Sequence, residues 1–206
     1  SSNLNSLETS LREKENIITI NKEILGKTGP NEVWDSKYKL DSLMYFFSVS
    51  GWIYVADNGV LDEIINSGKL SIINDLKIKT LISSLPQQIS QITEEDRLYR
   101  DDLHQYFLPH ISKKYKLRDI TKYRELYEYS KSDLGKSKHN ILNVDLITDL
   151  EFENILTIQS IWIKFSIEMC KNLEVKFKAI QKLIEDRYDD VDYSKLKLEL
   201  ESGFWG

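Results

Sequence analysis

Asp101 and His104 are the two residues whose types and spacing come nearest to a metal site. Residues three apart on a helix share a face, and di-iron bundles use an acidic-x-x-His pair from each of two helices. The chain has one such pair, and His110 follows six residues later as a third potential ligand. A metal-dependent enzyme built in a helical bundle around Asp101 and His104 is therefore the alternative hypothesis. An exposed polar helix face is the favoured interpretation.

Other catalytic patterns are missing from the sequence. It contains no G-x-S-x-G nucleophile turn, no H-E-x-x-H and no phosphate-binding glycine loop. The single cysteine, Cys170, rules out an intramolecular disulfide and lies among apolar residues, where a small packing residue is expected. We therefore expect no catalytic residue and no cofactor.

Two segments are candidates for binding a partner. Lys113, Lys114 and Lys116 open a basic stretch interleaved with tyrosines, which could contact phosphate groups or anionic lipid headgroups. The net charge of −5 argues against nucleic acid as the partner. The second candidate is Phe204-Trp205, because an apolar pair at a chain end docks within the fold or attracts a partner.

Composition predicts the fold class that positions these residues. Of the 206 residues 41% are hydrophobic and 30% charged, with only 8 Gly and 3 Pro, which suits long helices with solvated faces. We predict one all-α domain over residues 1–206, an antiparallel bundle of about five or six helices, two or three of them long. Its C-terminal tail, residues 190–206, docks on the domain or stays flexible.

Apolar spacing indicates the long helices. A first helix ends near Gly26, with apolar positions Leu4, Leu7, Leu11, Ile18 and Leu25. A second has the seam Ile78, Ile82, Leu85, Ile89, Ile92, Tyr99, Leu103 and Tyr106, and Leu108-Pro109 is expected to close it. A third runs from about Phe152 to about Tyr188, with Ile158, Trp162, Phe165, Met169, Leu173, Phe177, Ile180 and Ile184 as its core face. Helix faces between residues 36 and 57 stay open.

The stretch LDEIINSGKLSIINDLKIKTLI, from Leu61 to Ile82, predicts helix, turn, helix. Gly68 is placed to take a left-handed conformation after the first helix, and Asn74 or Asp75 to cap the next one. The same stretch resembles a recurrent segment of a family of uncharacterised, membrane-anchored proteins from Bacteroidota. DLEFENILTIQSIW, through Phe152 and Asn154, is similar to the segment that opens the last long helix of that family.

The resemblance implies a soluble all-helical domain behind an N-terminal membrane anchor, on the periplasmic side of the inner membrane. It carries no established activity. No segment of the given chain is itself long and apolar enough to be that anchor. We therefore expect a non-catalytic interaction or sensory domain, the extracytoplasmic part of a membrane-anchored bacterial protein, which binds a protein partner or associates with itself. A cytoplasmic location is the alternative.

Overall fold

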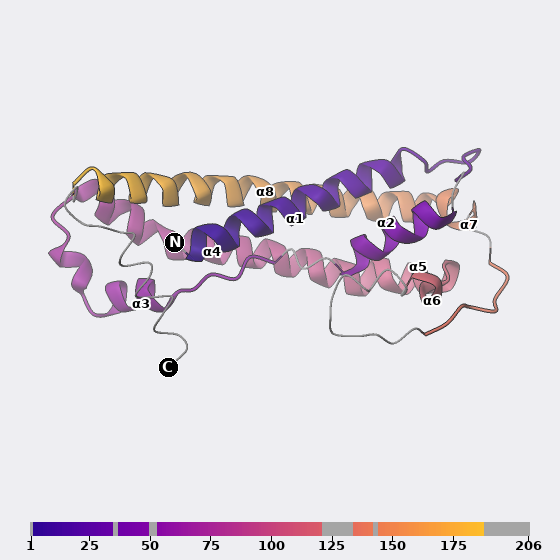
Figure 1. Ribbon diagram of the computed structural model, residues 1–206, viewed down its shortest axis with the longest axis horizontal. Helices are drawn as coiled ribbons and strands as arrows, with labels where there is room; N and C mark the ends of the chain where they lie inside the picture. The colour runs from indigo at the N-terminus through magenta and orange to yellow at the C-terminus, as the bar shows by residue number, and fades with distance from the viewer. Residues whose placement is uncertain (1, 35–36, 50–52, 121–133, 142–143, 188–206) are drawn as a thin grey trace.

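The computed structural model is an all-α bundle built on three long helices (Figure 1). It describes residues 2–34, 37–49, 53–120, 134–141 and 144–187; the remaining residues lie outside the described part. The long helices are α1 (Ser2–Leu25), α4 (Leu76–Asp102) and α8 (Leu150–Glu185). A π-helical turn, η2 (Leu103–Phe107), continues α4 directly into α5 (Leu108–Lys114). The predicted fold class is confirmed.

Helix α8 is the central element, because it packs on both α1 and α4 along most of its length. Pairs that join the helices give their directions. Asn21 and Glu15 of α1 contact Ser160 and Lys171 of α8, so the two helices are antiparallel. The bonds from Ser166 to Asp96 and from Lys176 to Ser84 show the same for α4 and α8. Helices α1 and α4 are therefore parallel to each other.

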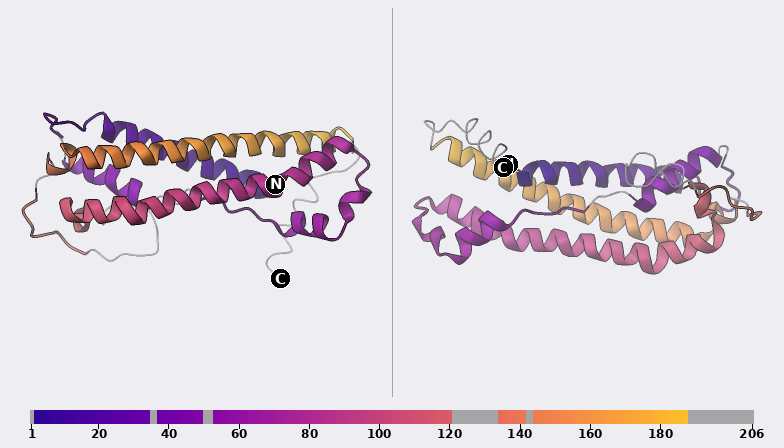
Figure 2. Two further views of the ribbon diagram at one scale, coloured as in Figure 1. Left: turned by 180° about the vertical axis from the view of Figure 1, so that it is seen from behind. Right: turned by 60° about the horizontal axis from the view of Figure 1, so that its bottom comes forward.

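Shorter elements close the bundle at its two ends. Helix α2 (Lys37–Val49) lies against α1 and contacts α6 (Leu117–Ile120), and α7 (Val144–Ile147) precedes α8. Helix α3 (Gly59–Asn66) and the 3-10 turn η1 (Lys69–Ile72) lie at the other end, as both views of Figure 2 show. The extended residues before α3 are fixed to α1, since Asn3 exchanges two hydrogen bonds with the backbone of Asp57.

The predicted helix, turn, helix around Gly68 is present. Gly68 has φ +74°, a left-handed conformation that glycine adopts without steric cost. Asp75 is the N-cap of α4, and its carboxylate accepts hydrogen bonds from the backbone N–H groups of Lys77 and Ile78. The segment is therefore a capped turn between two helices.

A buried ion pair joins two of the long helices in the core. Lys14 of α1 and Asp96 of α4 are 0% and 1% exposed, and their charged atoms lie 3.0 Å apart. Ser10 and Cys170 also accept hydrogen bonds from the Lys14 ammonium. The Asp96 carboxylate accepts from the Ser166 hydroxyl and from a backbone N–H. Because both charges are fully hydrogen-bonded, the pair joins the three long helices without an orphaned charge.

The seam predicted for α4 is confirmed up to Leu103, where every position is buried. The face predicted for α8 is wrong at Ile158 and Phe165, which are 47% and 50% exposed. It is confirmed at Leu173, which is buried, and at four positions that are partly buried against the core: Trp162, Met169, Phe177 and Ile180. The buried positions of α8 are Phe152, Ile155, Leu156, Gln159, Ile163, Ser166, Ile167, Cys170 and Leu173. Helix α8 has apolar residues on two faces, and the face toward the core also carries the polar residues Gln159 and Ser166. Hydrophobicity alone therefore assigned Ile158 and Phe165 to the core, although they lie on the outer face.

None of the described helices combines the length and apolar character needed to cross a membrane.

Candidate functional site

The junction between α4 and α5 contains an irregular turn. The N–H of Leu108 donates to the carbonyl of Leu103, five residues back, which makes residues Leu103–Phe107 a π-helical turn. The expectation that Leu108-Pro109 ends the helix is therefore wrong, because the helix continues to Lys114. Pro109 lacks an N–H and crowds the turn before it, and a wider turn accommodates both effects.

This turn changes which side chains face the core. In a regular helix Tyr106 would follow Leu103 on the buried seam, but it is 59% exposed and Phe107 is fully buried in its place. One extra residue in a turn rotates the rest of the helix by about 100° around the helix axis. The π-turn thus directs Tyr106 outward, and π-turns are frequent at functional sites.

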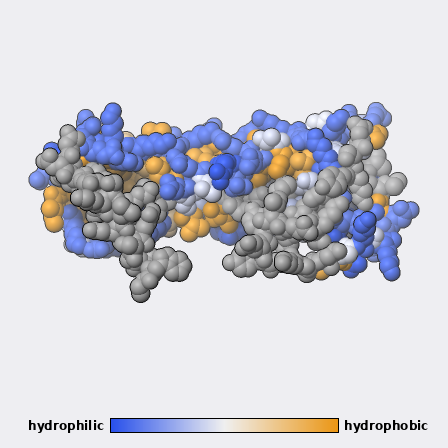
Figure 3. Space-filling view, in the orientation of Figure 1, coloured by the Kyte–Doolittle hydropathy of each residue, from blue (hydrophilic) through white to orange (hydrophobic). Residues whose placement is uncertain are grey.

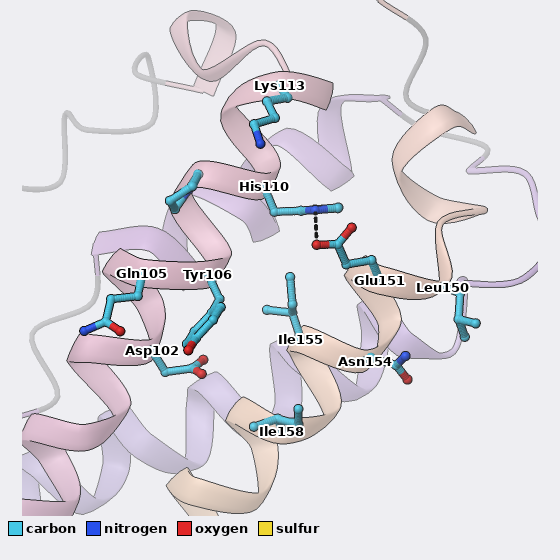
Figure 4. Close-up of a pocket in the computed structure, with 11 residues that line it drawn as sticks. Asp102, Gln105, Tyr106, His110, Lys113, Leu150, Glu151, Asn154, Ile155 and Ile158 are labelled. Carbon is cyan, nitrogen blue, oxygen red and sulfur yellow. Dashed lines mark ion pairs between the residues drawn. The ribbon is translucent and has the colours of Figure 1, made fainter.

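A groove of about 580 Å³ lies beside the π-turn, open to solvent. One wall comes from the end of α4, the π-turn and α5, and the other from the first turns of α8. Its lining residues are Asp102, Gln105, Tyr106, Pro109, His110, Lys113, Leu150, Glu151, Asn154, Ile155 and Ile158. Figure 4 shows Asp102, Tyr106 and Ile155 pointing into the space between the two walls, whereas Gln105 points away from it.

Asp102 is one of the two carboxylates that line this groove. Its Oδ2 atom is buried and has no hydrogen-bond partner among the described residues. Burial raises the pKa of Asp102, and the nearby Gln159 amide offsets only part of this rise. Gln159 is itself completely buried and makes no hydrogen bond of normal geometry with either amide atom within the described part of the chain. Most buried polar atoms in folded proteins have a hydrogen-bond partner, either a protein group or ordered water.

One end of the groove is closed by a charged cluster. Nε2 of His110 lies 2.7 Å from Oδ2 of Asp149. Nδ1 of His110 lies 3.3 Å from Oε1 of Glu151, the pair that Figure 4 marks with a dashed line. The Lys114 ammonium donates to the same Asp149 oxygen at 2.5 Å. Asp149 is also the N-cap of α8 and accepts from the N–H of Glu151. The cluster therefore ties the end of α5 to the start of α8.

The Asp149 carboxylate is stabilised in its charged form. Burial alone would raise its pKa, but the hydrogen bonds from Lys114, the Glu151 backbone N–H and His110 together outweigh it and lower the pKa below its ordinary value. The N-terminus of α8 adds positive potential at the same point. Asp149 is therefore expected to be ionised whenever the protein is folded near neutral pH.

The structure separates the three residues considered as metal ligands. Asp101 pairs with Arg97 one turn earlier on α4, and His104 is exposed on the π-turn. Among the described residues, His110 comes together instead with Asp149 and Glu151, the only group of three potential ligands there. In that group each carboxylate faces a different nitrogen of His110. A metal ion would also have to displace Lys114 against the positive end of α8, so the geometry fits an ion-paired helix cap better.

The lysines considered for partner binding have separate surroundings. Lys113 lines the groove, Lys114 binds Asp149, and Lys116 donates to the backbone carbonyl of His139 at 3.1 Å. Phe204 and Trp205 lie outside the described residues.

Sequence reasoning missed Asp102, Tyr106 and the cap cluster. Only Asp149, two residues before an acidic residue at the start of the last helix, carried a recognisable capping signal.

The outer face of α8 continues the apolar side of the groove. Its exposed apolar residues recur at helical spacing, and we define them as the α8 apolar row: Leu150, Ile158, Ile161 and Phe165. Leu150 and Ile158 line the groove, so the row and the groove form one surface. The face in Figure 3 shows hydrophobic patches along the middle of the long axis between hydrophilic residues, as expected for a bundle whose helices are not fully covered.

Comparisons of the chain with family models, with curated proteins and with solved structures give no match.

Proposed function

We propose that the chain is a non-catalytic interaction domain that binds an amphipathic segment of a partner polypeptide in the groove and along the α8 apolar row. The observation that carries this proposal is the second apolar face of α8. A helix of a bundle needs one apolar face for its own core, and α8 already has that face in Ile155, Ile163 and Leu173. The outer row contributes little to the fold and is available to a partner.

Spacing and size favour a helical segment as the occupant. The steps from Ile158 to Ile161 and on to Phe165 are three and four residues, and Leu150 lies eight residues, about two turns, before Ile158. Another helix matches this spacing with its own apolar positions. At ~1.5 Å per residue the row extends for roughly 22 Å, about four turns of a partner helix. The Asp102 and Glu151 carboxylates lie at the groove end of this surface, where they can fix the orientation of the bound helix by polar contacts.

Selection from a random library of helical peptides tests the proposal. Peptides are selected on the wild-type protein alone, and their affinity is then measured on Ile158→Glu, which places a charge in the middle of the row. The matched control is Val33→Glu, because Val33 is also an exposed apolar residue but lies in a loop and outside the groove. We expect selected peptides to lose at least about tenfold in affinity on Ile158→Glu and to bind Val33→Glu like wild type.

Two results would contradict this proposal. Selected peptides that bind wild type and Ile158→Glu equally would place the binding surface elsewhere. A wild-type protein that sediments as a dimer, and becomes a monomer on Ile158→Glu, would show that a second copy of the chain occupies the row.

We also propose, from the sequence resemblance, that this domain is the periplasmic part of a membrane-anchored bacterial protein. The test is protease accessibility of the full-length protein in cells whose outer membrane has been permeabilised. We expect digestion under those conditions. Protection until the inner membrane is lysed would place the domain in the cytoplasm.

A further inference from the structure

We infer that the segment bound in the groove presents a cationic side chain, a Lys ammonium or an Arg guanidinium, to Asp102. This inference rests on the proposed function and names the chemistry of the partner. Asp102 lines the groove, and its buried Oδ2 has no donor among the described residues. A buried carboxylate oxygen without a donor is costly, and a cation that enters the groove supplies the missing hydrogen bond.

The surroundings of Asp102 select a cation on an apolar stem. Ile155 and Ile158 form the apolar wall opposite Asp102, where the methylene groups of Lys or Arg can pack. Tyr106 offers an aromatic ring on the same side as Asp102, and rings of this kind attract cations over their faces. The positive groups of the groove, Lys113 and His110, lie at its other end, where His110 already faces Asp149 and Glu151.

The buried amide of Gln159 lies near Asp102 but does not replace the missing donor to Oδ2. Gln159 follows Ile155 and Ile158 on α8 and influences the carboxylate of Asp102, yet both of its amide atoms lack a partner within the described residues. A guanidinium or ammonium at Asp102 brings several donors to this position at once. The groove thus offers a carboxylate, Asp102, to a positive charge and an apolar wall, Ile155 and Ile158, to the stem that carries this charge.

Two small probes of equal size test the inference. Phenethylamine carries an ammonium at pH 7, and 2-phenylethanol carries a neutral hydroxyl on the same apolar stem. Each is titrated into the isotope-labelled protein, and the backbone amide signals of Asp102, Tyr106 and Ile155 are followed by NMR. We expect phenethylamine to bind at these residues about tenfold more tightly than 2-phenylethanol.

Asp102→Asn removes the charge and keeps the shape of the side chain. It should reduce phenethylamine binding about tenfold and leave 2-phenylethanol unchanged. The matched control is Asp101→Asn, since Asp101 is the neighbouring carboxylate, pairs with Arg97 and does not line the groove. This control should bind both probes like wild type.

The outcomes separate the inference from the proposed function. If both probes bind the groove equally, or if Asp102→Asn binds phenethylamine like wild type, the cation inference is overturned and the apolar groove remains a binding surface. If neither probe shifts the groove signals, the cation inference is overturned as well. The affinities of the selected peptides for wild type and for Ile158→Glu then decide the proposed function by themselves.

Discussion

Asp75 and Asp149 have the same role at opposite ends of the antiparallel α4 and α8 pair. Each is the N-cap of its helix, and each binds a basic side chain from the end of the other helix or its continuation. Arg187 donates to Asp75 at 2.7 Å, and Lys114 donates to Asp149. Anions at helix N-termini and cations at helix C-termini are both favourable, so each contact stabilises two helix ends at once.

Replacing Asp149 by alanine is expected to lower the free energy of unfolding by about 1 to 2 kcal/mol, because it removes an N-cap and the hydrogen-bond acceptor of Lys114 and His110. Urea denaturation at pH 7 measures the change. Glu153→Ala, in the same turn, is the control and should change stability by less than about 0.5 kcal/mol.

The low pKa of Asp149 also predicts a pH dependence. A carboxyl group whose folded pKa lies below its unfolded value stabilises the fold above the unfolded pKa of ~3.9, and this contribution is lost as pH falls through the folded pKa. Wild type should therefore lose more stability than Asp149→Asn between pH 6 and acidic pH. Parallel stability curves for the two proteins would show that the cap cluster does not titrate with folding.

For Asp102 we expect the opposite pH dependence of stability to that of Asp149. Burial raises its pKa, so its cost to folding appears as pH rises above the unfolded carboxyl pKa of ~3.9 and is complete above the raised folded pKa. Asp102→Asn should therefore increase the free energy of unfolding at pH 7 by up to about 1 kcal/mol and leave it unchanged at strongly acidic pH. Thermal unfolding at the two pH values checks this. A destabilised Asp102→Asn at pH 7 would mean that the charge has a partner within the fold.

The Lys14 and Asp96 pair predicts strong coupling between two substitutions. Lys14→Met or Asp96→Asn alone leaves one charge buried without its partner and should cost about 3 to 5 kcal/mol. The double variant Lys14→Met with Asp96→Asn removes both charges and keeps an acceptor for Ser166, so it should regain much of the loss. Denaturation of the single and double variants forms the cycle. Additive losses would show that the two charges are independent.

Cys170 should be unreactive in the folded protein. Its side chain is fully buried, and burial raises the pKa of the thiol, which the nearby Lys14 ammonium offsets only in part. We expect labelling by a thiol-specific disulfide reagent to be slower by several orders of magnitude in buffer than in urea. Rapid labelling in buffer would reveal local opening between α1 and α8, because the ammonium of Lys14 lies beside this sulfur.

Local signals in the sequence were sufficient to predict the long helices and the turn at Gly68. Residues 66–75 carry the glycine and the capping aspartate that the structure uses, and the seam of α4 follows a single apolar period. The last helix was predicted within a few residues at each end, from Leu150 to Glu185 against about Phe152 to about Tyr188. These features depend on neighbours in the chain, so one sequence is enough to find them.

The candidate site depends on residues that are distant in sequence, and it could not be predicted in the same way. His110 and Asp149 meet only because α5 and α8 pack together, and Lys14 and Asp96 are buried only because each has the other. A charged residue in a helical pattern is ordinarily solvated, so the sequence does not single out Lys14 or Asp96 as buried. The apolar spacing does not indicate the π-turn either. The one local signal for it is Pro109, which follows the turn.

The π-turn also sets how the chain tolerates a change in length. Shortening the turn Leu103–Phe107 by one residue would restore a regular helix and leave α5 in its present phase, because the wide turn holds one residue more than a regular turn. A one-residue deletion within α4 would instead rotate α5 by about 100°, and His110 and Lys114 would lose their alignment with Asp149 although both residues would still be present. The contacts beside the groove therefore depend on the phase of the helix as well as on its side chains, and the π-turn is the place where that phase tolerates the loss of a residue.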